Sequence, residues 1–159
     1  MLANRLKYIL PAIISPTQSA FVPGRLITNN ILVAHETLYT MHVRKKGKKG
    51  LIALKLYISK VYDWVEWPFL QGMMQKMGFP DKWIGWVMGC VTTPFSFILI
   101  NGKPYGNINP SSSIHQGDPL SPYLFLLCVE GLTSLLTKVE HDGRIHGYLF
   151  VEGRLKFHI

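Results

Sequence analysis

The feature that most restricts the fold of this chain is residues 113–122, Ser-Ile-His-Gln-Gly-Asp-Pro-Leu-Ser-Pro, where a polar loop enters a long apolar segment. Pro119 and Pro122 hold φ at about −65° and remove backbone hydrogen-bond donors. Ser121 is placed to cap a helix that has Pro122 at its first position. Because Gly117 lets the backbone approach a partner, this is a candidate binding loop on a rigid helix, although an ordinary loop-to-helix junction would use the same residues.

The apolar residues after this loop recur at helical spacing. They are Leu124, Cys128, Leu132, Leu135 and Val139. We therefore expect a long helix that ends at about His141. Residues 123–136 contain Glu130 and are fewer than the roughly 18–20 residues of a membrane span, so this segment is interpreted as a core helix.

The first forty residues predict two helices around a loop. Residues 1–14 have an amphipathic pattern that Pro11 is expected to break, and residues 15–27 have the prolines and glycine of a loop. Thr28 can cap the second helix. The residues expected on one face of that helix are Ile31, His35, Leu38 and Met41.

Two shorter helices are expected in the middle of the chain. One runs from Pro68 to about Met77, and the other covers residues 82–92 with Asp81 as its cap. The two cysteines of the chain, Cys90 and Cys128, both lie in apolar helical patterns. We interpret them as buried thiols and expect neither a disulfide framework nor a metal site.

The strand patterns are fewer and shorter. Residues 51–58 alternate as one strand, and residues 95–100 form a second. Asn101-Gly102 is a strong hairpin signal that leads to a third strand near 105–108, and a short strand is expected at 148–151. Helices between three or four strands predict an α+β fold, with a small antiparallel sheet packed with helices.

Composition limits the classes of protein that remain. With 159 residues, 48% of them hydrophobic and 16% charged, the chain is long and apolar enough for one folded domain or part of one. The formal net charge of +8 favours an anionic partner, with nucleic acid first. No signal peptide or membrane span is expected, so the protein is expected inside the cell and not at a membrane.

The densest charge lies in residues 44–49. Its five basic residues are Arg44, Lys45, Lys46, Lys48 and Lys49. They cannot pack together, so they predict an exposed loop that contacts nucleic-acid phosphates. A solvated linker between helix and strand, or a chance match to a nuclear import signal, would look the same.

Several motifs, in order along the chain, resemble those of the reverse transcriptases of LINE-type (non-LTR) retrotransposons, especially plant ones. The central one is Gln-Gly-Asp-Pro-Leu-Ser-Pro-Tyr-Leu-Phe, residues 116–125. The other matching segments are residues 2–10, 18–25, 30–32, 55–67, 100–102 and 143–147. The resemblance implies that residues 1–159 form one partial domain of fingers and incomplete palm, without the Asp-Asp hairpin and the thumb.

The resemblance also implies an RNA-directed DNA polymerase that uses two Mg²⁺ ions held by three aspartates. The family reads Lys-Leu-Asp where this chain reads Lys55-Leu56-Tyr57. A neutral phenol with a pKa of about 10 is a poor Mg²⁺ ligand. No Asp-Asp pair occurs in the 159 residues, and they end about where that hairpin is expected. We therefore expect no metal cofactor and no intact catalytic residue.

The same resemblance assigns binding roles to five residues of this sequence. They are Arg25, Lys55, Tyr62, Gln116 and Gly117. In the family, the residue that matches Arg25 belongs to a fingers loop, and the aromatic that matches Tyr62 lies behind the sugar of the nucleotide. The Gln-Gly pair contacts nucleotide and template. A solvated arginine and a buried aromatic at a turn are the corresponding structural alternatives.

Three acids and one histidine complete the expectations from the resemblance. Asp63 matches a second acid of the family motif that is not a metal ligand, and Glu66 lies in the same turn. Asp118 is expected to have a structural role in its loop. His115 stands where the family usually has Arg, so a permanent positive charge is lost.

Two classes of function follow. The chain is an inactive reverse transcriptase fragment, or it is a non-catalytic basic module that binds RNA or DNA weakly and without sequence preference. No specific protein partner is predicted. An active polymerase would need ligands that this sequence lacks.

Overall fold

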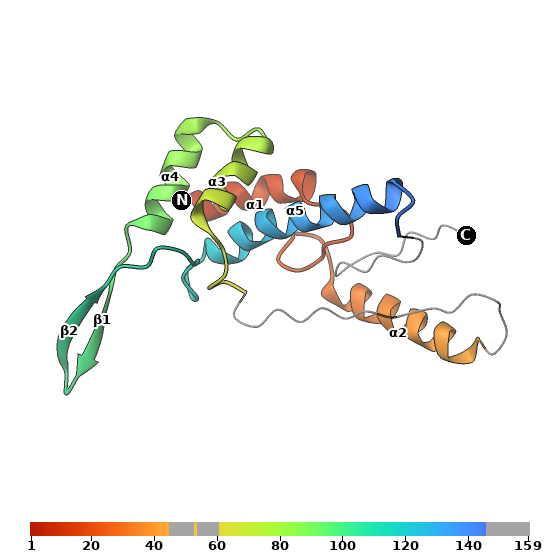
Figure 1. The fold of residues 1–159 in the computed structure, drawn as a ribbon, viewed down its shortest axis with the longest axis horizontal. Helices are drawn as coiled ribbons and strands as arrows, with labels where there is room; N and C mark the ends of the chain where they lie inside the picture. The colour runs from red at the N-terminus through yellow and green to blue at the C-terminus, as the bar shows by residue number, and fades with distance from the viewer. Residues whose placement is uncertain (45–52, 54–60, 146–159) are drawn as a thin grey trace. The chain divides into compact units, whose positions relative to one another are not determined.

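The computed structural model describes residues 1–44, 53 and 61–145. In this part, five helices and a two-stranded antiparallel sheet confirm the α+β prediction. The elements in order are α1 Leu2–Ile13, α2 Ile27–Val43, α3 Trp67–Lys76, α4 Asp81–Thr92, β1 Ser96–Ile100, β2 Lys103–Ile108 and α5 Ser121–His141 (Figure 1). The predictions for residues 51–58 and 148–151, and nearly all of the basic run, lie outside the described residues.

The chain divides into two compact units. Unit 1 comprises Met1–Arg5 and Lys60–Gly131, and unit 2 comprises Leu6–Ser59 and Leu132–Ile159. Each unit is described separately below.

Unit 1 is built on the pair α3 and α4, which lie side by side, and on the first half of α5 (Figure 1). The fully buried side chains include Leu70 and Met74 of α3 and Val87 of α4. Helix α5 approaches α3 closely at Gly131, where a Cβ atom would lie 3.1 Å from Met73 Sδ. A larger residue at this point would therefore require the Met73 and Phe69 side chains to shift by a few tenths of an ångström.

The end of α3 is set by Gly78, as its position in the sequence indicates. Gly78 has φ +81°, a left-handed conformation that side chains with a Cβ rarely adopt. Its N–H bonds to the Gln75 carbonyl at 3.0 Å, and the Phe79 N–H bonds to the Met74 carbonyl at 3.1 Å. This pair of bonds is a Schellman motif, and it satisfies the last carbonyls of the helix.

The prediction that Asp81 caps α4 is wrong. Pro80 is the N-cap: its carbonyl accepts the N–H groups of Trp83 and Ile84, and no side chain caps the helix. Asp81 is instead the first helical residue, where its charge complements the helix dipole. Cys90, expected to be buried, is exposed near the other end of α4.

The hairpin β1–β2 forms where the Asn-Gly signal places it. Asn101 and Gly102 have φ values of +51° and +78°, the positive values that a tight two-residue hairpin turn needs. Ile98 pairs with Tyr105, and Ile100 with Lys103. Apart from Ser96, the side chains of both strands are exposed, so the described helices leave this small sheet uncovered.

In unit 2, α1 continues through Pro11 to Ile13, so the expected break at this proline is wrong. Proline removes one N–H bond to the preceding turn, but it lies in the last turn, where the helix ends two residues later. The Ile14 N–H still bonds to the Leu10 carbonyl at 2.9 Å. Leu6 and Leu10 are fully buried and anchor this face of the helix.

Helix α2 has two points of comparison with its prediction. It begins at Ile27 after the extended residue Leu26, so Thr28 lies inside the helix and does not cap it. The second point concerns the predicted face of α2, which is exposed: Ile31 is 63% exposed and Leu38 is 54% exposed. The buried residue of α2 is Asn30, whose Oδ1 accepts the Ser19 hydroxyl at 2.8 Å. A polar contact therefore holds the start of α2 to the loop before it.

Helix α5 has the predicted length. It begins at Ser121, and Leu124, Leu126 and Leu127 are buried, whereas Leu132 and Leu135 of the predicted stripe are exposed. Among the described helices, α5 is the one long and apolar enough to cross a membrane, by length and composition alone. Core helices of soluble proteins pass the same test, so length and composition leave its environment open.

Candidate nucleotide-binding loop

The residues before α3 and the loop before α5 are joined by three hydrogen bonds. The Ile114 N–H donates to the Tyr62 carbonyl and the Ser113 N–H to the Val65 carbonyl, both at 2.9 Å. The Trp67 indole N–H donates to the Ser113 carbonyl at 2.8 Å. These bonds hold Ser113 at φ +90°, which is uncommon for a residue with a side chain.

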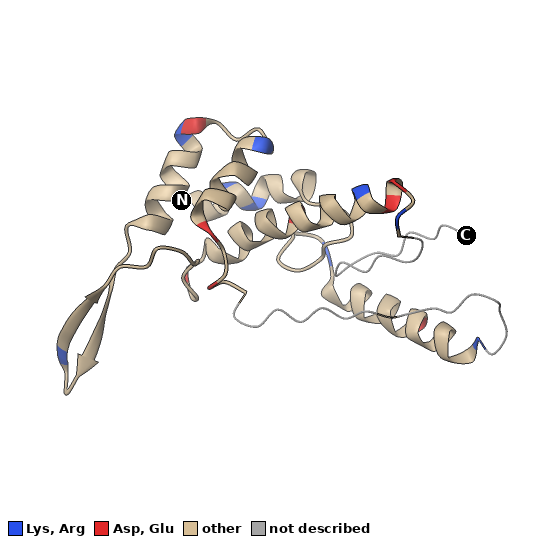
Figure 2. Ribbon diagram, in the orientation of Figure 1, with Lys and Arg blue, Asp and Glu red and all other residues tan. Residues whose placement is uncertain are grey.

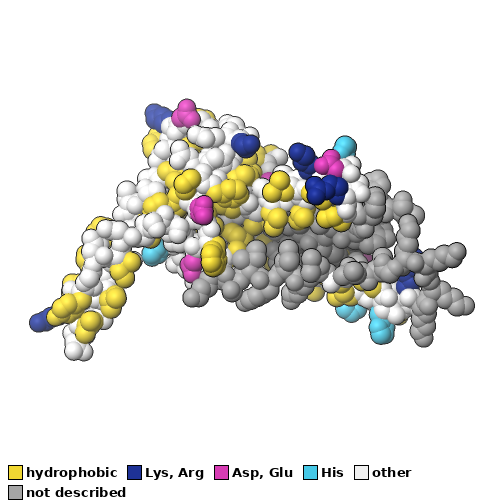
Figure 3. Space-filling model, in the orientation of Figure 1, with side chains coloured by type: hydrophobic (Ala, Val, Ile, Leu, Met, Phe, Trp, Pro, Cys, Tyr) yellow, Lys and Arg dark blue, Asp and Glu magenta, His cyan; other side chains and the backbone are white. Residues whose placement is uncertain are grey.

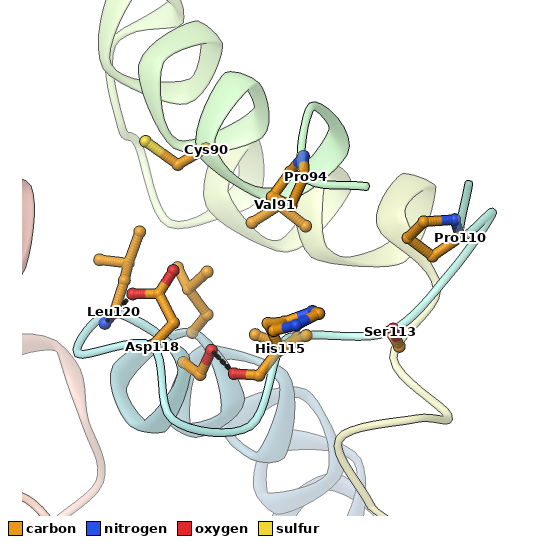
Figure 4. Close-up of a pocket in the computed structure, with 11 residues that line it drawn as sticks. Cys90, Val91, Pro94, Pro110, Ser113, His115, Asp118 and Leu120 are labelled. Atoms are coloured by element: carbon orange, nitrogen blue, oxygen red, sulfur yellow. Dashed lines mark hydrogen bonds between the residues drawn. The ribbon is translucent and has the colours of Figure 1, made fainter. Parts of the chain in front are cut away.

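Asp118 and Ser121 close the loop at its other end (Figure 4). The Leu120 N–H donates to Asp118 Oδ1 at 2.8 Å, which is an Asx turn. The Ser121 hydroxyl donates to the His115 carbonyl at 2.6 Å. Ser121 is the first helical residue rather than the N-cap, because the Leu120 carbonyl accepts the N–H groups of Tyr123 and Leu124, each at 3.1 Å. Asp118 has the structural role expected of it.

Gln116 and Gly117 lie at the exposed apex of this closed loop. Gly117 has φ +97°, so its conformation requires glycine even though no atom lies within 4 Å of where its Cβ would be. The loop therefore presents its backbone and the Gln116 side chain to solvent from a constrained base.

Behind the loop there is almost no free space. A cavity of about 10 Å³ lies between the end of α4, with Cys90, Val91 and Pro94, and the loop residues His115 and Asp118 (Figure 4). Such a volume holds at most about one water molecule. The contact with α4 thus supports the loop from behind, and any ligand of the loop has to bind on its exposed side.

Tyr62 lies at the base of the loop, half-buried, with its ring centroid 5.3 Å from that of Phe125. The structure therefore brings together three of the residues selected from the sequence: Tyr62, Gln116 and Gly117. Trp67 and Ser113 were not selected, although they join the two segments. The sequence did contain a signal for Trp67: an indole N–H usually needs a hydrogen-bond acceptor when it is buried, and Trp67 lies where a helix starts.

Arg25 belongs to unit 2 and has other partners. Its Nη1 donates to the carbonyls of Ser15 and Gln18, each at 2.6 Å. Its Nη2 donates to the carbonyls of Pro11 and Ile14 at 3.1 and 3.0 Å. The four terminal N–H donors of the guanidinium are thus matched by four backbone carbonyls around the end of α1.

The remaining selected residues give no site geometry. Lys55, Tyr57, Lys45, Lys46, Lys48 and Lys49 lie outside the described residues, and Arg44 is exposed at the C-cap of α2. Among described residues, no three His, Cys, Asp or Glu side chains are grouped so that they could hold a metal ion. Figure 2 shows that the acidic residues are distributed over several elements.

Burial removes one possible nucleophile. It raises the pKa of the Cys128 thiol from 9.0 to about 12, so this group is protonated at neutral pH. A thiol acts as nucleophile or metal ligand in its thiolate form. Cys128 is therefore an apolar packing residue of α5.

The Gln-Gly-Asp-Pro loop, closed by an Asx turn at the start of a long helix, lies within the part of the chain that matches a family of nucleic-acid polymerases. The chain belongs to the reverse transcriptase (RNA-dependent DNA polymerase) family, whose model matches residues 1–151.

Two of the relatives described next are retrotransposon proteins, which supports the LINE-type reverse transcriptase that the sequence motifs predicted. An uncharacterized 149 kDa protein of transposon TX1 from Xenopus laevis is 30% identical over 134 residues, 84% of this chain and 10% of that protein. The Pol polyprotein of the type-1 retrotransposable element R2 from Popillia japonica is 30% identical over 110 residues, 69% and 18% of the two chains. An uncharacterized mitochondrial protein from Arabidopsis thaliana is 47% identical over 53 residues, which are 33% of this chain and 43% of that protein.

The chain spans between a tenth and less than half of the length of these relatives. No solved structure matches it.

Proposed function

We propose that this chain is a reverse transcriptase domain that binds nucleic acid but does not extend primers. The observation that carries the proposal is a contrast between two positions of the family motif set. In the structure, hydrogen bonds close the loop that exposes Gln116 and Gly117 to solvent. In the sequence, Tyr57 occupies the metal-ligand position at the end of the 51–58 segment.

The side chains do not fit a catalytic metal pair. Two-metal nucleotidyl transfer needs carboxylates that clamp two ions about 3.5–4 Å apart. Tyr57 supplies a neutral phenol in place of a carboxylate, and the described acids Asp63 and Glu66 are exposed and not part of any metal-holding group. Mg²⁺ is therefore not a proposed cofactor, and no chemical step is assigned to this chain.

Retained binding is supported by charge and by the loop. The net charge of +8 attracts phosphates, and the exposed apex of the loop supplies a backbone surface that the family uses against nucleotide and template. This favours the non-catalytic binding module over a fragment with no remaining activity. The proposed partner is RNA or DNA, held weakly and without sequence preference.

Binding is tested by fluorescence anisotropy with a primed RNA template over a range of salt concentrations. Affinity should fall with salt because neutralised phosphates release counterions. Changing the five basic residues of 44–49 to Gln should make the slope of log affinity against log salt shallower, by as much as about 4 if each contacts one phosphate. A matched control changes five exposed basic residues elsewhere: Lys7, Lys76, Lys103, Lys138 and Arg144.

The control should change the slope less than the 44–49 variant. Equal slopes for the two variants would contradict a phosphate-binding role of the basic run. Absence of measurable binding by the unmodified chain at low salt would contradict the proposed function itself.

A further inference from the structure

A second surface of unit 1 lies away from the apex of the loop. Met1, Leu2 and Arg5, at the start of the chain, line an open groove of about 440 Å³ together with Trp86 and Cys90 of α4. We call it the α1–α4 groove. Cys90 also lines the small cavity behind the loop, so the two surfaces meet at α4.

Trp86 is the aromatic residue of this groove and is 46% exposed. Its orientation is constrained on α4, because the Trp83 ring packs edge-on at 6.3 Å between centroids. The Lys82 ammonium lies over the Trp86 ring, 5.4 Å from its centroid, in a cation–π contact, so a stacked base would take the other face of the indole. A fixed, half-exposed indole beside a cation is therefore presented at the surface.

The charge of the groove is positive. Arg5 lines it and is exposed, Lys82 lies beside the indole, and none of the five lining residues is acidic. The nearest acid along α4 is Asp81, the first residue of the helix, beside Lys82 in the sequence. Figure 2 shows this acidic and basic pair at the start of α4. Two cations against one acid favour an anionic ligand.

We infer that the α1–α4 groove binds a segment of single-stranded nucleic acid, with one base stacked on Trp86 and its phosphates held by Arg5 and Lys82. Non-specific single-strand sites combine aromatic stacking surfaces with a positively charged groove, and both are present here. A single strand is favoured over the interior of a duplex, because bases inside a duplex are stacked on each other and reach an indole only when flipped out. This inference rests on the proposed function only in that the chain binds nucleic acid.

The first test measures binding of short oligouridylate, oligothymidylate and an abasic oligodeoxynucleotide by anisotropy. Trp86→Leu should weaken binding of the two base-containing strands by roughly 5- to 150-fold, the range for loss of one stacked base, and leave the abasic strand unchanged. The control is Tyr39→Leu, which removes an aromatic residue that is 63% exposed on α2. Comparison of the first two strands shows whether RNA or DNA is preferred.

The second test addresses the phosphates. The double variant Arg5→Gln/Lys82→Gln should make the single-strand salt slope shallower by about 1.4, corresponding to two lost phosphate contacts. Its control, Lys76→Gln/Lys138→Gln, removes the same charge from two exposed lysines outside the groove. Circular dichroism melts of every variant report whether it folds. If Trp86→Leu does not fold, the charge variant and its control still test the inference.

Three results would overturn the inference. The first is that Trp86→Leu binds all three strands with the same affinities as Tyr39→Leu. The second is that the salt slopes of Arg5→Gln/Lys82→Gln and Lys76→Gln/Lys138→Gln are equal. Self-association that depends on Trp86, with unchanged oligonucleotide binding, would assign the groove to a second copy of the chain. In each case, continued salt-dependent binding of the primed template leaves the proposed function standing, whereas loss of that binding in the unmodified chain contradicts both.

Discussion

Arg25 shows most clearly how a residue's role depends on its neighbours in space. The resemblance assigns it to a fingers loop near template and nucleotide, and that role stays a prediction. In the structure its guanidinium bonds to four carbonyls between Pro11 and Gln18. Only the Nε–H of its five donors is not among these bonds. This arrangement makes Arg25 a residue that holds the end of α1 and the following loop together.

Arg25→Lys should therefore lower the stability of the chain. A lysine ammonium cannot reproduce a planar fork aimed at four carbonyls, so about 2–3 kcal/mol of unfolding free energy should be lost. Urea unfolding measures it. Arg144→Lys, at an exposed arginine, is the control and should change stability by less than about 0.5 kcal/mol. Unchanged stability together with weaker nucleic-acid binding would instead make Arg25 a ligand contact.

The start of α5 also shows that a residue's role depends on its neighbours in space, here within a few residues along the chain. From the sequence, Ser121 is a good N-cap, and the helix start was placed correctly to within one residue. Which side chain closes the loop depended on the path of residues 115–118, because Asp118 reaches the Leu120 N–H while Ser121 reaches the His115 carbonyl. Hydrophobic periodicity and residue preferences do not predict the backbone path of residues 115–118.

At the scale of elements, local signals predicted best where local chemistry decides. The Asn101-Gly102 turn and the Gly78 end of α3 follow from backbone preferences of a few residues, and the length of α5 follows from the helical spacing of its apolar residues. Local signals do not tell what covers a helix, and the face of α2 with Ile31 and Leu38 is exposed. An apolar pattern identifies a helix but does not identify what covers it.

The hairpin β1–β2 is the element most exposed to unwanted contacts. Its exposed apolar residues are Phe97, Ile98, Leu99, Ile100, Tyr105 and Ile108, and Figure 3 shows hydrophobic side chains along it. A two-stranded sheet also has two unpaired edges. Association between copies of the chain is therefore expected at this element.

Leu99→Lys should increase the monomeric fraction without destabilising the fold, because Leu99 is 69% exposed and a charge on an edge strand opposes pairing. Light scattering after size-exclusion chromatography at micromolar concentration measures it. Lys76→Arg, which keeps the charge of α3, is the control. A clean monomer for the unmodified chain, with a sharp cooperative melt, would show that the hairpin does not drive association.

At the scale of the whole molecule, the family and the α+β class were predictable because several motifs occur in a fixed order along the chain. The same motifs identified Tyr62, Gln116 and Gly117, which the structure then placed around one loop. The α1–α4 groove was not predicted, because Arg5 and Trp86 lie far apart in the sequence and only the fold of unit 1 brings them together.

The central claim, binding without polymerisation, is tested most directly by primer extension. The unmodified chain and Tyr57→Asp are incubated with a primed RNA template, deoxynucleotides and Mg²⁺ or Mn²⁺, beside an active reverse transcriptase as positive control. Neither chain should extend the primer, because one restored carboxylate cannot clamp two metal ions. Tyr57→Asp combined with an Asp-Asp hairpin grafted after Ile159 is expected to recover a trace, increased by His115→Arg. Template-dependent extension by the unmodified chain would contradict the account.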